Sequence, residues 1–214
     1  MRRFPAHVPL DQDYVHFDAI RCDGSLAFSE SLQCVWPCSF DLLRTFLKGY
    51  VQDTLFLDPH NLTIEDVSNT RLYQKLTAKA VWINYLQGYF TESDRVVVVF
   101  RQIEADKAAK EVTPSVKQAH FMAWLEARPV SPTHAVLRIS TQFSPQFRPA
   151  DDGLFSAEDH AAFWDFDLSG VPEGGDKMEA LGRAFVRQAH ERVPAWRQAI
   201  SSILDTMHNK EVNE

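Results

Sequence analysis

The feature that most constrains the fold of this chain is a long amphipathic run near its end. Apolar residues recur at helical spacing over residues 176–208, with charged residues between them, and Gly174 and Gly175 precede the run. Pro194 lies inside it and predicts a kink or a short break, because proline cannot donate the helical hydrogen bond. A single long helix must bury its apolar stripe against another element, and the rest of the chain offers strands.

The segments before this helix alternate apolar and polar residues with the period of two that is typical of strands. The clearest run is Ser25–Trp36, which ends at Pro37 because proline cannot donate to a ladder. Further strands are predicted at residues 54–57, 61–67, 71–82, 95–103, 119–128 and 134–143. Short connections between such segments favour antiparallel neighbours.

Two short helices are predicted among these segments. Ser39 is a predicted N-cap of a helix that ends at Gly49, and Ser156 opens another helix through a capping box with Asp159. No internal repeat and no Gly/Ser-rich linker divides the chain, so one domain over residues 1–214 is predicted. The predicted fold class is α+β, with a curved antiparallel β-sheet wrapped around the long C-terminal α-helix.

Composition limits the partners of the chain. The formal net charge is -7, and a net-acidic domain is a poor general ligand for nucleic acid or anionic membranes. We therefore expect no nucleic-acid partner and at most transient membrane contact. Cys22, Cys34 and Cys38 are too few to staple a domain of this size, and we interpret them as free thiols in a reducing, cytoplasmic compartment. The sequence predicts no metal, no cofactor and no catalytic residue, because it contains none of their motifs.

Two polar residues interrupt the apolar faces of predicted strands. Glu30 lies between Phe28 and Leu32 on an inward face, and Gln74 lies between two leucines in the same way. An unpaired buried carboxylate is unfavourable, and the basic residues of 71–82 are predicted to point outward. We therefore expect a ligand hydroxyl or an ordered water beside Glu30, and a raised pKa of its carboxyl. Two interpretations stay open: both residues orient the polar end of a ligand, or both lie at a bulge or at the rim of the sheet.

The order of elements resembles START-type lipid-transfer domains, within the wider helix-grip class. Residues 166–172 read FDLSGVP and are similar to the turn that leads into the last helix of many START domains. Residues 194–196, PAW, resemble a proline-plus-apolar spot within that helix. The chain departs from the family at its start, where no N-terminal helix is evident, and in an insert at residues 148–165. The resemblance implies an elongated internal cavity, closed by the last helix and neighbouring loops, that binds one hydrophobic molecule.

The predicted ligand-binding residues line this cavity. Six of them are apolar, four from strands and two from the last helix: Phe100, Leu125, Ile139, Phe143, Phe185 and Trp196. Glu30 and Gln74 add polar groups. The predicted function is non-enzymatic binding, and transfer, of a lipid or other hydrophobic small molecule. Two alternatives stay open: an enzyme on the same scaffold, cyclase- or hydrolase-like, or an interaction module whose core is filled by its own aromatic residues.

The outer side of three predicted strands also carries an apolar patch. It consists of Val97, Val99, Met122, Trp124 and Val136. An exposed patch of this kind marks a protein-partner surface. The alternative, which we favour, is that residues 4–17 cover it.

Overall fold

The computed structural model describes residues 4–5, 7–22, 25–51, 63–67, 70–103, 116–148 and 153–213. Its strands are β1 Tyr14–Cys22, β2 Ser25–Trp36, β3 Thr63–Val67, β4 Thr70–Leu76, β5 Trp82–Thr91, β6 Val96–Gln102, β7 Phe121–Ser131, β8 His134–Phe143, β9 Phe147–Arg148 and β10 Gly153–Leu154. Its helices are α1 Phe40–Gly49, α3 Ala157–Trp164 and α4 Lys177–Asn213. The strand predicted at residues 54–57 lies outside the described residues.

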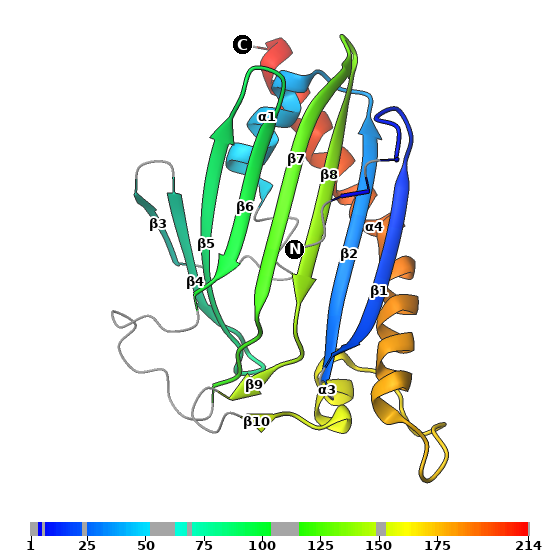
Figure 1. Cartoon of the computed structure of the whole chain (residues 1–214). Coiled ribbons are helices and arrows are strands. Elements are labelled where there is room, and N and C mark those ends of the chain that lie inside the picture. Colours follow the sequence, from blue (N-terminus) through cyan, green and yellow to red (C-terminus); the bar gives the residue numbers. More distant parts are fainter. Residues whose placement is uncertain are drawn as a thin grey trace.

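Eight strands form one antiparallel sheet in the order β1-β2-β8-β7-β6-β5-β4-β3, and β9 pairs with β10 in a small separate ladder. The sheet curves, and α4 lies diagonally against its concave side (Figure 1). The first half of α4 contacts β1 and β2, and α1 contacts β7 and β8 at the opposite end of the sheet. The predicted α+β helix-grip fold is confirmed.

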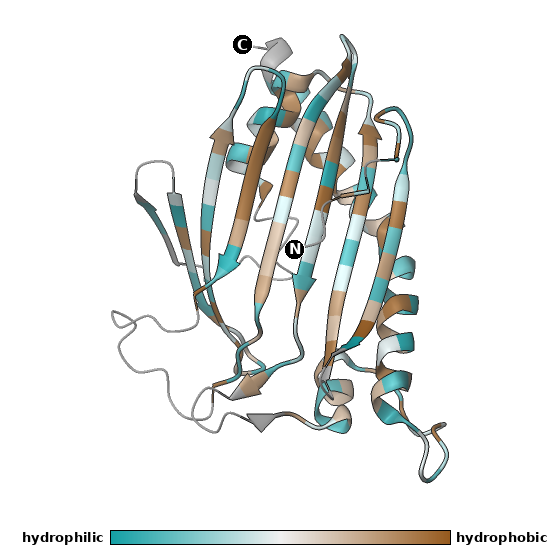
Figure 2. Ribbon diagram, in the orientation of Figure 1, coloured by the Kyte–Doolittle hydropathy of each residue, from teal (hydrophilic) through white to brown (hydrophobic). Residues whose placement is uncertain are grey.

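Alternating residues explain why the strands bury one face. In β2 the even-numbered positions from Leu26 to Trp36 point to the concave side, and all of them except Glu30 are nearly fully buried. Figure 2 shows the same alternation of hydrophobic and hydrophilic residues along β7 and β8. Central strand β6 is covered on both faces along Val96–Val98, as its unbroken apolar sequence predicts.

Local sequence signals begin the two short helices. Ser39 caps α1 by accepting a hydrogen bond from the Leu42 backbone amide at 3.2 Å. Ser156 and Asp159 form the predicted capping box of α3. Both confirm the predicted starts, and α1 ends at Gly49 as expected.

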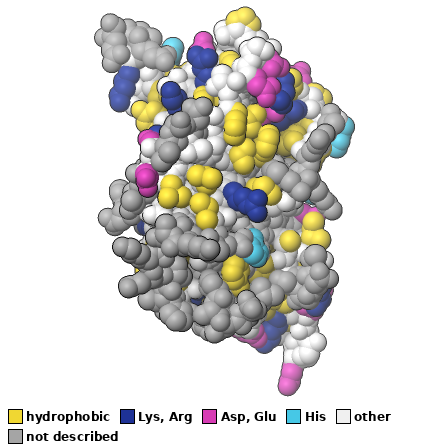
Figure 3. Space-filling model, turned by 60° about the vertical axis from the view of Figure 1, so that its left-hand side comes forward, with side chains coloured by type: hydrophobic (Ala, Val, Ile, Leu, Met, Phe, Trp, Pro, Cys, Tyr) yellow, Lys and Arg dark blue, Asp and Glu magenta, His cyan; other side chains and the backbone are white. Residues whose placement is uncertain are grey.

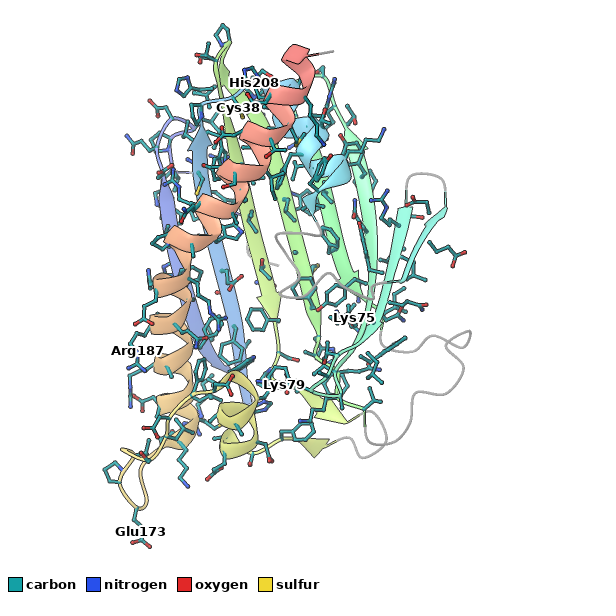
Figure 4. All side chains as sticks on the ribbon, turned by 180° about the vertical axis from the view of Figure 1, so that it is seen from behind. Cys38, Lys75, Lys79, Glu173, Arg187 and His208 are labelled. Atoms are coloured by element: carbon teal, nitrogen blue, oxygen red, sulfur yellow. The ribbon has the colours of Figure 1, made fainter. Side chains whose placement is uncertain are left out.

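The last helix runs through Pro194 without a break and changes direction between its two halves (Figure 4). The prediction of a kink therefore fits better than that of a break. No described helix is long and apolar enough to cross a membrane.

Two strands of the sheet are absent from the predictions. β1 alternates like a strand, with Val15, Phe17 and Ala19 facing the core, but its residues 14–17 were assigned to the segment that covers the outer patch. β5 has apolar and polar residues on both faces, so its sequence shows no period. The strand predicted at residues 71–82 is wrong as a single element, because a turn with Ala80 at φ 57° separates β4 from β5.

Candidate functional site

The concave face has two ends with different packing. We call the region beneath α1 the α1 end; there Leu125, Leu137 and Ile139 form one buried cluster with Leu43 and Phe46 of α1. We call the region beside α3 the α3 end; there Phe28 and Phe185 form a second cluster, against which the half-buried Phe143 and Trp164 pack.

Aromatic rings dominate the α3 end. Phe28 lies 5.2 Å from Phe143, 4.5 Å from Phe185 and 5.1 Å from Trp164 between ring centroids. Towards the middle of the sheet, Tyr85 stacks on Phe121 at 4.5 Å. Phe143, Phe121 and Tyr85 all point to the concave side yet stay only half-buried, so they are accessible where a filled core would cover them.

Glu30 lies between these two ends. Its strand neighbours across the sheet are Phe17 on β1 and Thr141 on β8. The Thr141 hydroxyl is within hydrogen-bonding reach of the carboxyl, and Arg192 of α4 attracts it from a distance. Desolvation outweighs both and raises the pKa of Glu30 from 4.5 to about 7. The inward position confirms the face that the sequence context predicts for Glu30, and its role in ligand binding stays a prediction.

Gln74 does not lie with Glu30. Its chain neighbours Tyr73 and Lys75 are the buried residues of β4, whereas Leu76 is 55% exposed. Gln74 therefore lies on the convex side, where its amide donates to Asn84 Oδ1 at 3.1 Å. The predicted inward placement is wrong, because Leu72 and Leu76 of β4 face outward and Tyr73 and Lys75 face inward.

The far side of the concave face carries further polar groups that the sequence patterns did not mark. The Tyr73 hydroxyl donates to Gln87 Oε1 at 2.5 Å, and both residues are buried. Lys75 is buried on the same side of β4 and is labelled in Figure 4. Burial raises the pKa of the Tyr85 hydroxyl, so this phenol stays protonated.

The other predicted lining residues divide between the two ends. Phe143 and Phe185 meet at the α3 end with ring centroids 5.4 Å apart. Leu125 and Ile139 lie in the closed cluster of the α1 end, and Trp196 packs edge-on against Trp36 at 6.3 Å. Phe100 is fully buried beside Tyr73.

Three lysine side chains contact residues of α3. Lys79, from the turn between β4 and β5, donates to the Phe163 carbonyl at 2.6 Å (Figure 4). Lys177 at the start of α4 pairs with Glu158 at 2.5 Å. Lys117 lies over the Phe163 ring at 5.8 Å. These contacts connect α3 with β4, β5 and α4 across the lower end of the sheet.

His160 on α3 was not predicted as a site residue. It is fully buried between Phe155 and Trp164, and neither ring nitrogen has a hydrogen-bond partner in the described part of the chain. Burial lowers its pKa, so the ring is neutral. Its sequence context, a lone histidine among apolar residues of a helix, is the same as that of an ordinary core residue.

The outer apolar patch is divided by the N-terminal segment. Gln33 donates to the Pro9 carbonyl at 2.5 Å and Arg138 to the Val8 carbonyl at 3.1 Å, and Val136 beside them is fully buried. Residues 8–12 thus cover the Val136 side, which is part of the cover expected from residues 4–17, whereas residues 14–17 lie in β1 and Trp124 stays 38% exposed. Trp124 lines an open groove of about 500 Å³ together with Leu86, Gly88, Phe90, Val97 and Val99. Hydrophobic side chains gather on this face in Figure 3.

Cys34 is buried and Cys38 half-buried, both as free thiols, and the Cys22 side chain lies outside the described residues. Burial raises the pKa of both thiols to about 11, so they are protonated at neutral pH. The described residues contain no group of three or more His, Cys, Asp or Glu side chains that could hold a metal ion.

No family model and no curated protein sequence matches the chain. Among solved structures, an aromatase/cyclase from a Streptomyces species is similar at 12% identity and a TM-score of 0.46, over 86% of this chain and 95% of that one. Human STARD10 is similar at 11% identity and a TM-score of 0.42, over 92% of this chain and 81% of that one. A STAR-related lipid transfer protein from Xanthomonas axonopodis is similar at 8% identity and a TM-score of 0.42, over 62% of this chain and 84% of that one. The helix-grip fold is shown by the sheet and the last helix themselves, and these similarities carry no activity to the chain.

Proposed function

We propose that the protein binds one lipid or other hydrophobic small molecule, without converting it, between the α3 end of the concave face and α4. The observation that carries the proposal is Glu30, a half-buried carboxyl that points inward beside Phe17 and has, among the described residues, the Thr141 hydroxyl as its hydrogen-bond partner. A polar group in such surroundings orients a ligand whose remaining surface is apolar.

The half-buried aromatic residues support the same proposal. Phe121, Phe143 and Tyr85 point inward and keep accessible surface, which an apolar ligand would bury with a gain of roughly 25 cal/mol per Å². Phe28 of β2 and Phe185 of α4 pack against Phe143. The buried residues of the α1 end then serve as the rigid support of the site.

We further propose that the protein carries this ligand in a reducing compartment, the cytoplasm. Two free thiols, Cys34 and Cys38, support that location. Contact with a donor or acceptor membrane would be brief, because the net charge of -7 opposes lasting adhesion to anionic lipids.

Native mass spectrometry of the protein purified from cells tests the proposal. We expect an added mass that organic solvent releases and that a saturating amount of an uncharged fluorescent lipid replaces. The Phe143→Ala variant should take up less of this probe, and Trp124→Ala, which changes an aromatic residue on the convex face, is the matched control. A bare mass together with no uptake of the probe by the unaltered protein would reject the proposal in favour of a filled core.

A further inference from the structure

We infer that the ligand carries a basic nitrogen whose cation pairs with Glu30 on the concave face. This inference rests on the proposed function and specifies the chemical class of its ligand. It comes from a difference between the two carboxylates that lie on this side of the sheet in the described part of the chain.

The first carboxylate has its counter-charge within the protein. Asp66 on edge strand β3 accepts two hydrogen bonds from the Arg71 guanidinium, one of them at 3.1 Å. The second, Glu30, forms no ion pair with any described residue, and Arg192 acts on it only at longer range. A carboxylate that is desolvated and left without a cation is unfavourable. Glu30 therefore needs a positively charged partner from outside the protein, whereas Asp66 already has one in Arg71.

The rings around Glu30 suit a cation. Phe17 lies directly opposite on β1 and is buried, and Phe28 is the next inward residue along β2. Phe28 in turn stacks with Phe143 across β8, with ring centroids 5.2 Å apart. Aromatic faces next to a carboxylate are a favourable environment for an ammonium group, since the ring quadrupole and the negative charge both attract it.

The charged groups near Glu30 leave room for this cation. On β8 the facing residue is Thr141, and on β1 it is Phe17. From α4, the His190 ring lies 4.9 Å from the Phe17 ring between centroids, and among the described residues the exposed Arg192 is the charge that acts on Glu30. Lys75 lies on β4, with β5, β6, β7 and β8 between it and β2, so its repulsion is weak.

A cation on the ligand also interacts more favourably with Glu30 than the ligand hydroxyl that the sequence suggests. A ligand hydroxyl makes one hydrogen bond to Glu30 but leaves a net charge among apolar groups. A protonated amine makes a charge-assisted hydrogen bond and cancels that charge, which is worth more in a desolvated site. The overall negative charge of the protein favours the approach of a cation as well.

Two probes of equal chain length test the inference: decylamine, which stays protonated between pH 6 and 8, and decanol. Isothermal titration calorimetry should show decylamine binding more tightly than decanol at pH 8. Its affinity should rise about tenfold from pH 6 to pH 8, following the ionised fraction of a carboxyl with a pKa of about 7. The affinity for decanol should not rise.

Two variants assign the effect to one residue. Glu30→Gln should bind decanol nearly as well as the unaltered protein, but should lose both the preference for decylamine and its pH dependence. Glu191→Gln removes the same charge from an exposed position of α4 and should behave like the unaltered protein. Equal binding of the two probes, or decylamine affinity that falls with pH, would overturn the inference and leave the proposed function standing. Failure of both probes to bind would reject the inference and the proposed function together.

Discussion

The two ends of the concave face are built from similar residues but packed differently. At the α1 end, Leu43 and Phe46 close over Leu125 and Ile139, and every one of these side chains is nearly fully buried. At the α3 end, inward rings such as Phe143 keep accessible surface. The difference comes from what covers each end: α1 fits directly against β7 and β8, whereas the described part of the α3 end is flanked by α3 and the first half of α4.

This difference teaches that the direction in which a side chain points and the degree to which it is buried are separate properties in a curved sheet. Alternation along a strand fixes the side to which a residue points. Whether it becomes core depends on an element that comes from elsewhere in the chain. Glu30 lies between the closed α1 end and the less completely packed α3 end, and its side chain is accordingly only half-buried.

The strongest test of the comparison is a pair of matched truncations. Phe46→Ala at the α1 end should lower the free energy of unfolding by roughly 3–5 kcal/mol, as expected for a fully packed phenylalanine. Phe143→Ala at the α3 end removes the same atoms but fewer contacts, so its effect should be clearly smaller. Urea unfolding monitored by circular dichroism measures both. Equal losses would show that the α3 end is packed as tightly as the α1 end.

The pH dependence of stability tests the position of Glu30. Its pKa of about 7 in the folded protein lies above the ordinary value of 4.5, so the native state binds a proton that the unfolded chain releases. The stabilisation is fully present below pH 4.5 and is lost as the pH rises through 7. Glu30→Gln should match the unaltered protein at pH 4.5 and be more stable at pH 8, by roughly 3 kcal/mol at most. Parallel stability curves from pH 4.5 to 8 would place Glu30 in solvent.

A third test separates shape from polarity at Glu30. Glu30→Leu should weaken binding of a hydroxylated ligand such as decanol by about tenfold, roughly the 1.4 kcal/mol of a lost buried hydrogen bond. Glu30→Gln keeps the shape and a hydrogen-bonding group, so its effect should be smaller. Displacement of a bound, uncharged fluorescent lipid by decanol measures the order of the three affinities. Identical affinities for all three proteins would assign Glu30 to the rim.

The smallest expected effect concerns the caps of the two short helices. Ser39→Ala at α1 and Ser156→Ala at α3 each remove one capping side chain, worth about 1 kcal/mol. Because α1 belongs to the main buried cluster, its loss should appear in global unfolding. Loss of the α3 cap should instead increase amide hydrogen exchange within α3 and leave the global midpoint nearly unchanged. Equal changes in the global midpoint would mean that both ends unfold as one unit.

Much of the fold could be predicted from sequence because most of its strands have one solvent-exposed face and one buried face. β2 and β8 show this alternation clearly, and the caps at Ser39 and Ser156 mark the helix starts. β5 could not be found, because it carries residues such as Tyr85 and Gln87 on the concave side and Leu86 and Phe90 on the convex side. A strand with mixed character on both faces shows no period of two.

The candidate site was predictable only in part. Glu30 stands out because its strand is otherwise apolar on that face. The sequence context of Gln74 gives the wrong face, since β4 turns its leucines outward and buries Tyr73 and Lys75, which is the reverse of the usual apolar pattern. The division between the α1 end and the α3 end depends on contacts between distant segments, and no local pattern encodes it.

The strand order has a consequence for how the chain folds during synthesis. β2 lies beside β8, and the register pairs Glu30 with Thr141, so the first hairpin has no neighbour until more than half of the chain has left the ribosome. Until then the β1–β2 hairpin keeps its apolar face exposed. The sheet becomes continuous only after β8 is synthesised and pairs with both β2 and β7. Contacts so far apart in sequence slow folding. Nascent chains that stop before β8 are therefore the species that need protection by a chaperone.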